Sequence, residues 1–329
     1  MKRVIVTGGS GFIGYHLADY LSRQDIELTV IDNHARGKSD AMFEKLISRT
    51  NVKFLNADMT DKDFYSRLNG YYDQIYHLAA INGTKNFYER PYDVLRANIL
   101  TLMNMLEWCN SKNCGGFLYT SSSETYAGTL NCFFDEHPEF LPSSENIPLT
   151  IDNVLNPRWS YGGSKLIGEI LTANYCRVIN IPFKIIRYHN IYGPRMGFEH
   201  VIPEFIKRIY NRENPFKIFG GQETRAFCDV RDGIRATEAV MQSEKCNGEI
   251  VHIGKSDEEI KIIDLLKKLL AIAKYNPEFS IQPAPTGSVK RRCPNTNKLY
   301  ELTGYRAKIS LDEGLPVIFD WYMKKYSEI

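Results

Sequence analysis

Long apolar runs are missing from this chain. No uninterrupted hydrophobic stretch reaches the roughly 20 residues that a transmembrane helix needs, so we expect no membrane segment. The apolar run after Lys2 and Arg3 ends at Thr7, which is too short for the core of a signal peptide. The sequence therefore predicts a protein that neither spans a membrane nor carries a secretory leader.

An excess of charge is also missing, because 41 Lys and Arg residues balance 39 Asp and Glu residues to a net charge of +2. A nucleic-acid-binding protein usually shows a basic patch or stripe, so we expect neither a nucleic-acid partner nor a structural role on nucleic acid. The seven cysteines show neither C-x-x-C nor metal-ligand spacing. They predict reduced thiols in a cytoplasmic protein without a metal site.

The chain does have a glycine-rich turn at its start. A short β-branched run ends at Thr7, Gly8, Gly11 and Gly14 follow, and an amphipathic segment begins. Such a turn needs a residue that tolerates positive φ, and it lets the backbone approach a pyrophosphate closely. The N-terminus of the following helix offers unpaired N–H groups to phosphates. The pattern predicts a strand, a turn and a helix that bind a dinucleotide.

A second apolar run, residues 28–31, ends in Asp32, about 20 residues beyond the glycines. An acidic residue there binds the adenosine ribose hydroxyls and repels a 2′-phosphate, which favours NAD over NADP. Two features point the other way: Asp32 could simply form a turn, and Arg36 would suit NADP.

Strands and helices alternate along the first half of the chain, with further strands expected at residues 53–57, 74–80 and 116–120. This alternation predicts an α/β fold with a parallel sheet. Asp58 and the Met59 backbone would lie near adenine, although Asp58 could equally be a helix cap. The strand at 74–80 ends in small residues, which let a cofactor cross its carboxyl end; His77 inside it fits a core histidine. Residues 128–158 are expected to be irregular, as a flap over a site.

Tyr161 and Lys165 are four residues apart, so they share one helix face. A tyrosine that acts as a base at neutral pH needs its pKa lowered by roughly 3 units, which is about 4 kcal/mol. A nearby ammonium group, a helix N-terminus and a positively charged nicotinamide all favour the phenolate. Ser122 closes a strand at the same edge of the sheet as the glycine turn, which brings these side chains together.

Together these motifs resemble the extended short-chain dehydrogenases/reductases, in particular the NAD-dependent nucleotide-sugar epimerases and dehydratases. The resemblance covers essentially the whole chain. It is carried by residues 7–14, Asp32 and Asn33, Asp58, residues 77–80, Asn98, and residues 121–124, 161–165, 187–195, 225–227 and 291–294. The fold implied is a Rossmann-type doubly wound parallel sheet with a smaller C-terminal α/β substrate domain.

The resemblance also implies roles by position. Tyr161 would take the proton of the sugar 4-hydroxyl while hydride passes from C4 to NAD. The catalytic set implied is Tyr161, Lys165, Ser122, Ser123 and Glu124. The cofactor-binding set is Gly8, Gly11, Phe12, Ile13, Gly14, Asp32, Asn33, Asp58, Met59, Leu78, Ala79, Ala80, Asn98, Tyr161, Lys165 and Tyr188. The set for the nucleotide-diphosphate sugar is Asn190, His200, Arg225 and Arg292.

The step after C4 oxidation stays open. A 4-epimerase or 4-dehydrogenase needs only Tyr161, Lys165 and Ser122, whereas a 4,6-dehydratase needs a further base, for which Glu124 is the candidate. Ser123 stands where many dehydratases have Asp, and residues 157–159 resemble bacterial uronate decarboxylases. Ala127 where glycine usually stands leaves the geometry of the Glu124 loop open. A non-catalytic NAD-binding sensor is the alternative of another class.

The expected domains are 1–190 as the NAD-binding domain, with 226–255 rejoining it, and 191–225 together with 256–329 as the nucleotide-sugar-binding domain. The helices expected near residues 92–108 and 161–178 are apolar over more than one stripe. A helix on a sheet needs only one such stripe. We therefore expect a homodimer formed through these two helices. The family resemblance implies a cytoplasmic enzyme of polysaccharide biosynthesis.

Overall fold

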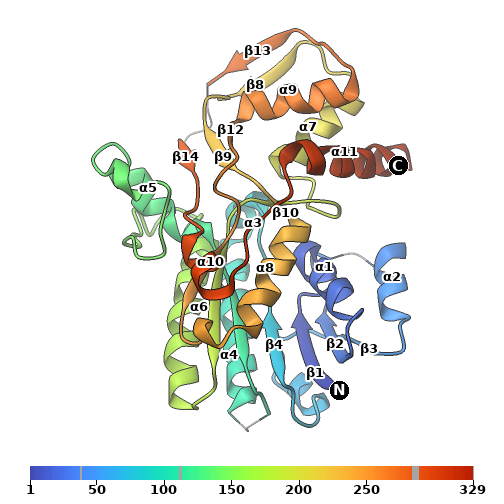
Figure 1. Ribbon diagram of the computed structural model, residues 1–329, viewed down its shortest axis with the longest axis vertical. Coiled ribbons are helices and arrows are strands. Elements are labelled where there is room, and N and C mark those ends of the chain that lie inside the picture. Colours follow the sequence, from blue (N-terminus) through green and yellow to red (C-terminus); the bar gives the residue numbers. More distant parts are fainter. Residues whose placement is uncertain (38, 111–112, 284–288, 329) are drawn as a thin grey trace. The chain divides into compact units, whose positions relative to one another are not determined.

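The computed structural model describes residues 1–37, 39–110, 113–283 and 289–328 (Figure 1). Its main sheet is seven-stranded, with the order β11-β6-β5-β4-β1-β2-β3. The strands are β1 (Lys2–Thr7), β2 (Ile26–Asp32), β3 (Val52–Asn56), β4 (Gln74–His77), β5 (Phe117–Ser122), β6 (Phe183–Tyr188) and β11 (Ile250–Ile253). The strand pairs β5–β4, β4–β1, β1–β2 and β2–β3 are all parallel.

This strand order confirms the predicted Rossmann-type doubly wound sheet. The chain reverses direction across the sheet between β1 and β4, and ligands of such sheets bind at this switch point, beyond the carboxyl ends of the strands. Strand β11, which lies in the region 226–255 expected to rejoin the first domain, pairs with the main sheet beside β6.

Helices connect the strands. They are α1 (Phe12–Leu21), α2 (Ala41–Ile47), α3 (Thr84–Glu89), α4 (Pro91–Cys109), α5 (Ala127–Phe133), α6 (Trp159–Val178), α7 (Val201–Tyr210), α8 (Val230–Gln242), α9 (Ile262–Ala273), α10 (Asn297–Thr303) and α11 (Leu311–Ser327). Short 3-10 helices lie at η1 (Asp63–Arg67), η2 (Ser123–Tyr126), η3 (Pro138–Phe140) and η4 (Glu244–Cys246). The expectation that residues 128–158 are irregular is therefore wrong in part, because α5 and η3 lie there.

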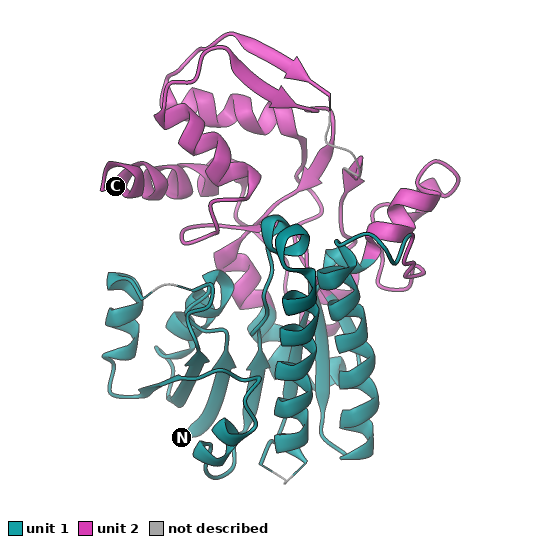
Figure 2. Ribbon diagram, turned by 180° about the vertical axis from the view of Figure 1, so that it is seen from behind, with its two compact units in different colours: residues 1–125, 153–187, 237–251 teal, residues 126–152, 188–236, 252–329 magenta. Residues whose placement is uncertain are grey.

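The described residues form two compact units, coloured separately in Figure 2. The first comprises residues 1–125, 153–187 and 237–251, and the second residues 126–152, 188–236 and 252–329. Three small sheets complete the fold. Their strands are β7 (Ile191–Tyr192) with β10 (Cys228–Asp229), β8 (Phe216–Phe219) with β13 (Phe279–Gln282), and β9 (Thr224–Ala226) with β12 (Glu259–Lys261) and β14 (Arg291–Arg292).

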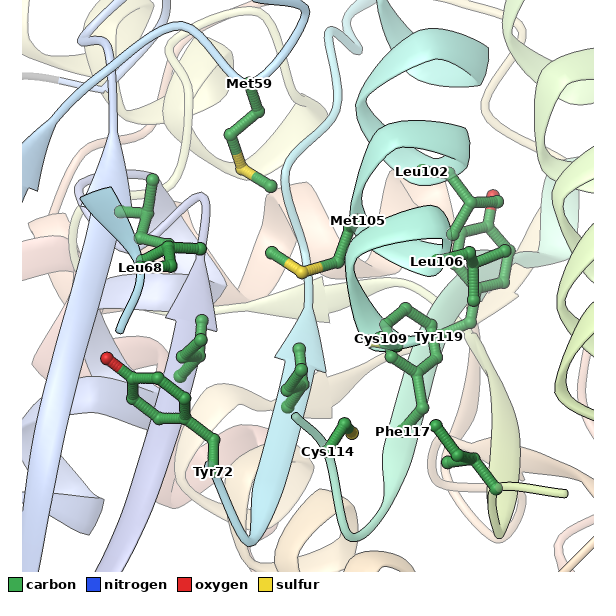
Figure 3. Packing of buried hydrophobic residues seen from close by; sticks show 14 of the residues in the cluster. Met59, Leu68, Tyr72, Leu102, Met105, Leu106, Cys109, Cys114, Phe117 and Tyr119 are labelled. Carbon is green, nitrogen blue, oxygen red and sulfur yellow. The ribbon is translucent and has the colours of Figure 1, made fainter. Parts of the chain in front are cut away.

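The core of the first unit lies between the sheet and helix α4, as Figure 3 shows. Leu102, Met105 and Leu106 of α4 are buried against Phe117 and Tyr119 of β5. Pro91 begins this helix, where its missing N–H costs nothing. Helices α4 and α6 pack against each other along their length (Figure 1). This packing fixes α6, which carries Tyr161 and Lys165, relative to the sheet.

Candidate active site

The glycine turn between β1 and α1 is shaped to bring its backbone close to a ligand. Gly8 has a φ of +69°, and a Cβ there would lie 2.8 Å from the Ala79 backbone nitrogen. A Cβ on Gly14 would lie 2.1 Å from the Gly8 carbonyl oxygen, so the helix can pack onto the turn only with glycine at this position. Helix α1 begins after Gly11 with no capping side chain and no acidic residue in its first turn. Its N-terminus, which includes Phe12 and Ile13, is suited to a phosphate.

Asp32 lies at the carboxyl end of β2, beside this turn. Its Oδ2 accepts a hydrogen bond from the Ser10 N–H at 3.0 Å, and its Oδ1 accepts one from the His34 N–H at 2.8 Å. A carboxylate has about four acceptor positions, so these bonds orient Asp32 and leave capacity for ribose hydroxyls. Asn33 follows it, and its side chain accepts from the Ala35 N–H at 3.0 Å.

The end of β4 provides a small-residue surface next to the turn. The N–H groups of Leu78 and Ala79 donate to Thr7 Oγ1 at 3.1 and 3.0 Å, and Ala80 follows. Asp58 accepts from the Thr60 N–H at 2.9 Å, which makes it the start of a turn after β3. Met59 is buried, and its carbonyl oxygen accepts from the Asn104 amide at 3.1 Å.

The residues of the first unit thus fit a dinucleotide, since the turn would be filled by any Cβ at Gly8 or Gly14 and an uncapped helix N-terminus follows. Gly8, Gly11 and Gly14 would hold its pyrophosphate and Asp32 its adenosine ribose. His77 lies apart from this surface: it is fully buried in β4, and burial lowers its pKa to about 3. Its Nδ1 hydrogen-bonds with Thr7 Oγ1 at 3.2 Å, as expected for a core histidine.

Tyr161 lies in the first turns of α6 and is 9% exposed. Burial raises its pKa, while the nearby polar side chains of Ser122 and Asn82 oppose that shift. The Ser122 hydroxyl also accepts from the Glu124 N–H at 3.2 Å, which places it at the start of η2. The structure therefore places Ser122 close to the hydroxyl of Tyr161. With its pKa raised in this way, the phenol stays protonated at neutral pH.

Lys165 is buried one turn along α6. Its Nζ donates to the Thr120 carbonyl oxygen at 2.8 Å and lies 5.8 Å from the centre of the Tyr161 ring. Burial lowers the pKa of Lys165 to about 7, and Glu169 opposes this shift. A buried ammonium beside the phenol favours the phenolate, so Lys165 is placed to lower the pKa of Tyr161 when it is charged.

A buried ion pair between Glu169 and Arg187 lies one turn from Lys165, and sequence reasoning missed it. Glu169, one turn further along α6, binds Arg187 of β6 through two hydrogen bonds of 2.8 and 2.6 Å. Ser121 of β5 donates to the same carboxylate. The three side chains tie the end of the sheet to α6. The sequence did offer a signal for this ion pair: a glutamate one helical turn after Lys165, and an arginine in the strand that follows.

Glu124 of η2 pairs with Arg158, which stands just before α6, at 3.3 Å. Both side chains are about one-fifth exposed. The negative charge of Glu124 also contributes to the raised pKa of Tyr161, so the two groups are near neighbours. Ser123 is buried beside them. Arg158 was part of a recognised motif, but its contact with Glu124 could not be read from the sequence.

Asn98 of α4 is buried, and its amide binds the protein itself. Its Oδ1 accepts from the Ile81 N–H at 2.7 Å, and its Nδ2 donates to the Ile81 carbonyl oxygen at 3.1 Å and to Ser164 Oγ at 3.0 Å. Asn98 thus fixes the segment after β4 against α6. In this segment the ring of Phe87 stacks on Tyr161 and Asn82 lies close to its hydroxyl, and sequence reasoning missed both.

The remaining predicted residues belong to the second unit. Tyr188 ends β6, and His200 stands just before α7. Asn190 donates from its Nδ2 to the Ala226 carbonyl oxygen at 3.1 Å. Arg225 and Arg292 are direct neighbours in the parallel pair β9–β14. The Arg225 guanidinium donates to the carbonyl oxygens of Thr224 and Val289, each at 2.7 Å.

Among the described residues, no group of three or more His, Cys, Asp or Glu side chains could hold a metal ion. In the same part of the chain, no helix is long and apolar enough to cross a membrane. All seven cysteines are free thiols.

Comparison with known sequences places residues 4–254 in the NAD dependent epimerase/dehydratase family. The UDP-N-acetyl-alpha-D-glucosaminuronate decarboxylase of Bacillus cytotoxicus is 30% identical over 329 residues, 98% of both chains. A putative UDP-glucose 4-epimerase of Methanocaldococcus jannaschii is 29% identical and covers 97% of both chains.

Solved structures agree in fold. The UDP-glucose 4-epimerase of Thermotoga maritima, crystallised with UDP-glucose, has a TM-score of 0.84 and 26% identity over 98% of this chain and 99% of that one. The UDP-glucuronic acid 4-epimerase of Bacillus cereus, in complex with UDP-glucuronic acid and NAD, has a TM-score of 0.81 and 26% identity over 98% and 100%. The family resemblance predicted from the motifs is confirmed: the chain belongs to the NAD dependent epimerase/dehydratase family and is an enzyme of that type.

Proposed function

We propose that this enzyme binds NAD and oxidises a nucleotide-diphosphate sugar at C4, giving a 4-keto intermediate. The observation that carries the proposal is the placement of Ser122 close to the Tyr161 hydroxyl, beside the buried amine of Lys165. NAD, when bound, supplies the hydride acceptor and a positive charge. The protein's own residues supply the base, its hydrogen-bond partner and the groups that bind the cofactor.

In the proposed reaction Tyr161 takes the proton of the 4-hydroxyl as the C4–H bond breaks. Ser122 shares a hydrogen bond with the phenol oxygen and holds the substrate hydroxyl in line. Lys165 favours the phenolate by its charge and holds the nicotinamide ribose. Burial and the charge of Glu124 raise the pKa of Tyr161. The base is therefore switched on when a positively charged cofactor binds.

For the substrate's diphosphate we propose Arg225 and Arg292, with Asn190 and His200 as further substrate-binding residues. The supporting observation is the direct pairing of the two arginines across β9 and β14. The planar guanidinium group matches phosphate oxygens in two-point hydrogen bonds. A nucleotide diphosphate would neutralise both arginines at once.

Simple 4-epimerisation or 4-oxidation is the first candidate for the overall reaction. Chemistry beyond C4, by 4,6-dehydration or uronate decarboxylation, is the second, and the Glu124–Arg158 ion pair favours it. This pair adds a second proton acceptor, the Glu124 carboxylate, next to Tyr161, together with a cation to face a sugar carboxylate. The relative from Bacillus cytotoxicus is named a uronate decarboxylase, in line with this candidate.

One experiment separates these reactions. Purified protein is incubated with UDP-, GDP- and dTDP-sugars, including UDP-glucuronate, and the products are analysed by mass spectrometry. Loss of two hydrogens indicates a 4-dehydrogenase, loss of water a dehydratase, loss of carbon dioxide a decarboxylase, and a changed retention time without a mass change an epimerase. No reaction with any of these sugars would contradict the proposal.

We also propose that the enzyme is a homodimer formed through α4 and α6. After α4 packs on the sheet, aliphatic side chains remain at the surface of both helices: Ile99, Met103, Ile167, Ile170 and Val178. We call this set the aliphatic face. Ile170 is 56% and Val178 81% exposed. Leaving such side chains in water costs roughly 25 cal/mol per Å², so a second copy of the same face is a suitable partner.

The proposed location is the cytoplasm, because all seven cysteines are free thiols and all of them except Cys132 are buried. Activity of the reduced protein, and its loss of solubility under oxidising expression, would support this location. Full activity only after disulfide formation would contradict it.

A further inference from the structure

A parallel stack of two aromatic rings links helix α3 to the proposed catalytic base. The ring of Phe87 lies against the ring of Tyr161, with 5.0 Å between centroids and 10° between planes. Offset parallel rings attract each other beyond the area that they bury. Both residues are 9% exposed, and Val94 and Ile81 complete the same apolar cluster. One face of the phenol ring is therefore covered by an apolar side chain.

The stack is held in place by buried hydrogen bonds. Asn98 binds both the N–H and the carbonyl oxygen of Ile81, at 2.7 and 3.1 Å, and reaches Ser164 of α6 at 3.0 Å. The Asn86 amide donates to the Asn82 carbonyl oxygen at 2.7 Å. These bonds fix the segment that carries Phe87 to the helix that carries Tyr161. Phe87 thus has one defined place relative to the phenol.

The other neighbours of Tyr161 are polar or charged. Ser122 and Asn82 lie close to its hydroxyl, and charge interactions reach it from Glu124 and Arg36. Lys165 lies on the same helix as Tyr161, and Tyr119 of β5 is near enough to Tyr161 for their charges to interact. On α3 the charged Lys85 and Glu89 pair with each other at 3.8 Å and are about 60% exposed, so they face solvent. Within this set only Phe87 covers the ring with an aromatic face.

We propose that Phe87 is a positioning residue of this active site, which aims the Tyr161 hydroxyl and keeps water off one face of its ring. This inference rests on the proposed function, in which Tyr161 is the base. Phe87 does not touch the reacting atoms. It fixes the direction of the phenol and contributes to the burial that raises the pKa of Tyr161.

The test is the pH dependence of turnover in F87A. Water that enters beside the ring stabilises the phenolate, so the acid limb of the kcat profile should move to lower pH by about half a unit or more. The plateau kcat should fall about tenfold because the hydroxyl is less well aimed, while KM changes less than kcat. Y88A is the matched control, since Tyr88 is the next residue of α3 and is 58% exposed. Its profile should stay as in the wild type.

F87L covers the case in which F87A does not fold, because leucine keeps apolar volume but no ring face. It should show a smaller shift in the same direction. An acid limb that stays in place in both variants, or in F87L when it alone folds, would overturn the inference. Y161F distinguishes failure of the proposed function from failure of this inference. If Y161F is inactive while the Phe87 variants behave as wild type, the proposed function stands and the positioning role of Phe87 fails. If Y161F is active, the proposed function itself fails.

Discussion

Glu124 and Arg158 form an ion pair of 3.3 Å beside Tyr161, although one belongs to the turn after β5 and the other precedes α6. An arginine next to a carboxylate favours its charged form. The pair thus keeps a second proton acceptor in the immediate surroundings of the proposed base. Whether the reaction uses Glu124 as a proton acceptor depends on the chemical step that follows C4 oxidation.

If the reaction goes beyond C4, E124Q should abolish the final product while reduced cofactor still accumulates, because the first step needs only Tyr161, Lys165 and Ser122. R158Q should lower turnover on a uronate more than on the neutral sugar. The readouts are absorbance at 340 nm and product mass. E124Q with nearly full activity would assign the enzyme to simple epimerisation or 4-oxidation at C4.

We propose that Asp32 makes the enzyme bind NAD in preference to NADP. D32A removes the carboxylate that would accept the adenosine ribose hydroxyls, and a hydrogen bond to a charged group contributes about 1.5–3 kcal/mol. NAD affinity should therefore fall by roughly tenfold to a hundredfold, and the preference for NAD over NADP should shrink. Calorimetric titration with both cofactors measures this. Unchanged affinity for NAD, or tighter wild-type binding of NADP, would contradict the assignment.

Lys165 should make the stability of the cofactor-free protein depend on pH. Burial lowers its pKa to about 7 from 10.5, so between these values the unfolded state binds more protons than the folded state. Stability must then rise with pH across this window, by at most about 1.4 kcal/mol per unit. Urea unfolding at pH 7 and pH 9 should show a larger gain for the wild type than for K165M. Equal gains would show that Lys165 is not buried in this way.

The proposed dimer predicts the effect of charge on the aliphatic face. I170E places a carboxylate where a second subunit would bury it, so the protein should sediment as a 37.9 kDa monomer at micromolar concentration. I281E is the matched control, because Ile281 of β13 is 64% exposed and lies outside α4 and α6. A wild type that is monomeric, or a dimer that survives both I170E and M103E, would refute the interface.

The fold could be predicted because its signals are local. The glycine turn, the acidic end of β2 and the alternation of strands and helices each occupy a short stretch of sequence. Helix α3 was missed because it has six residues between Gly83 and Pro91, of which only Phe87 is buried. A helix of this length shows no periodicity. Its position depends on Asn98, which is distant in the sequence.

The site could be predicted only in part. Tyr161, Lys165 and Ser122 stand in recognisable motifs, and the structure places them together. The contacts of Phe87 and Asn82 with Tyr161 could not be predicted, because they depend on how α3 packs against α6. Whether the two arginines of β9 and β14 pair also depends on strand register, which no local pattern reveals.

The central claim is that the substrate is oxidised at C4 with Tyr161 as the base. The most direct measurement uses a nucleotide sugar that carries deuterium at C4, chosen from the sugars that the enzyme converts. The protein is quenched with acid during turnover, and the cofactor and sugar are analysed by mass spectrometry. We predict deuterium on the reduced cofactor in the wild type and none in Y161F. Turnover of the sugar with no deuterium ever reaching the cofactor would contradict the account.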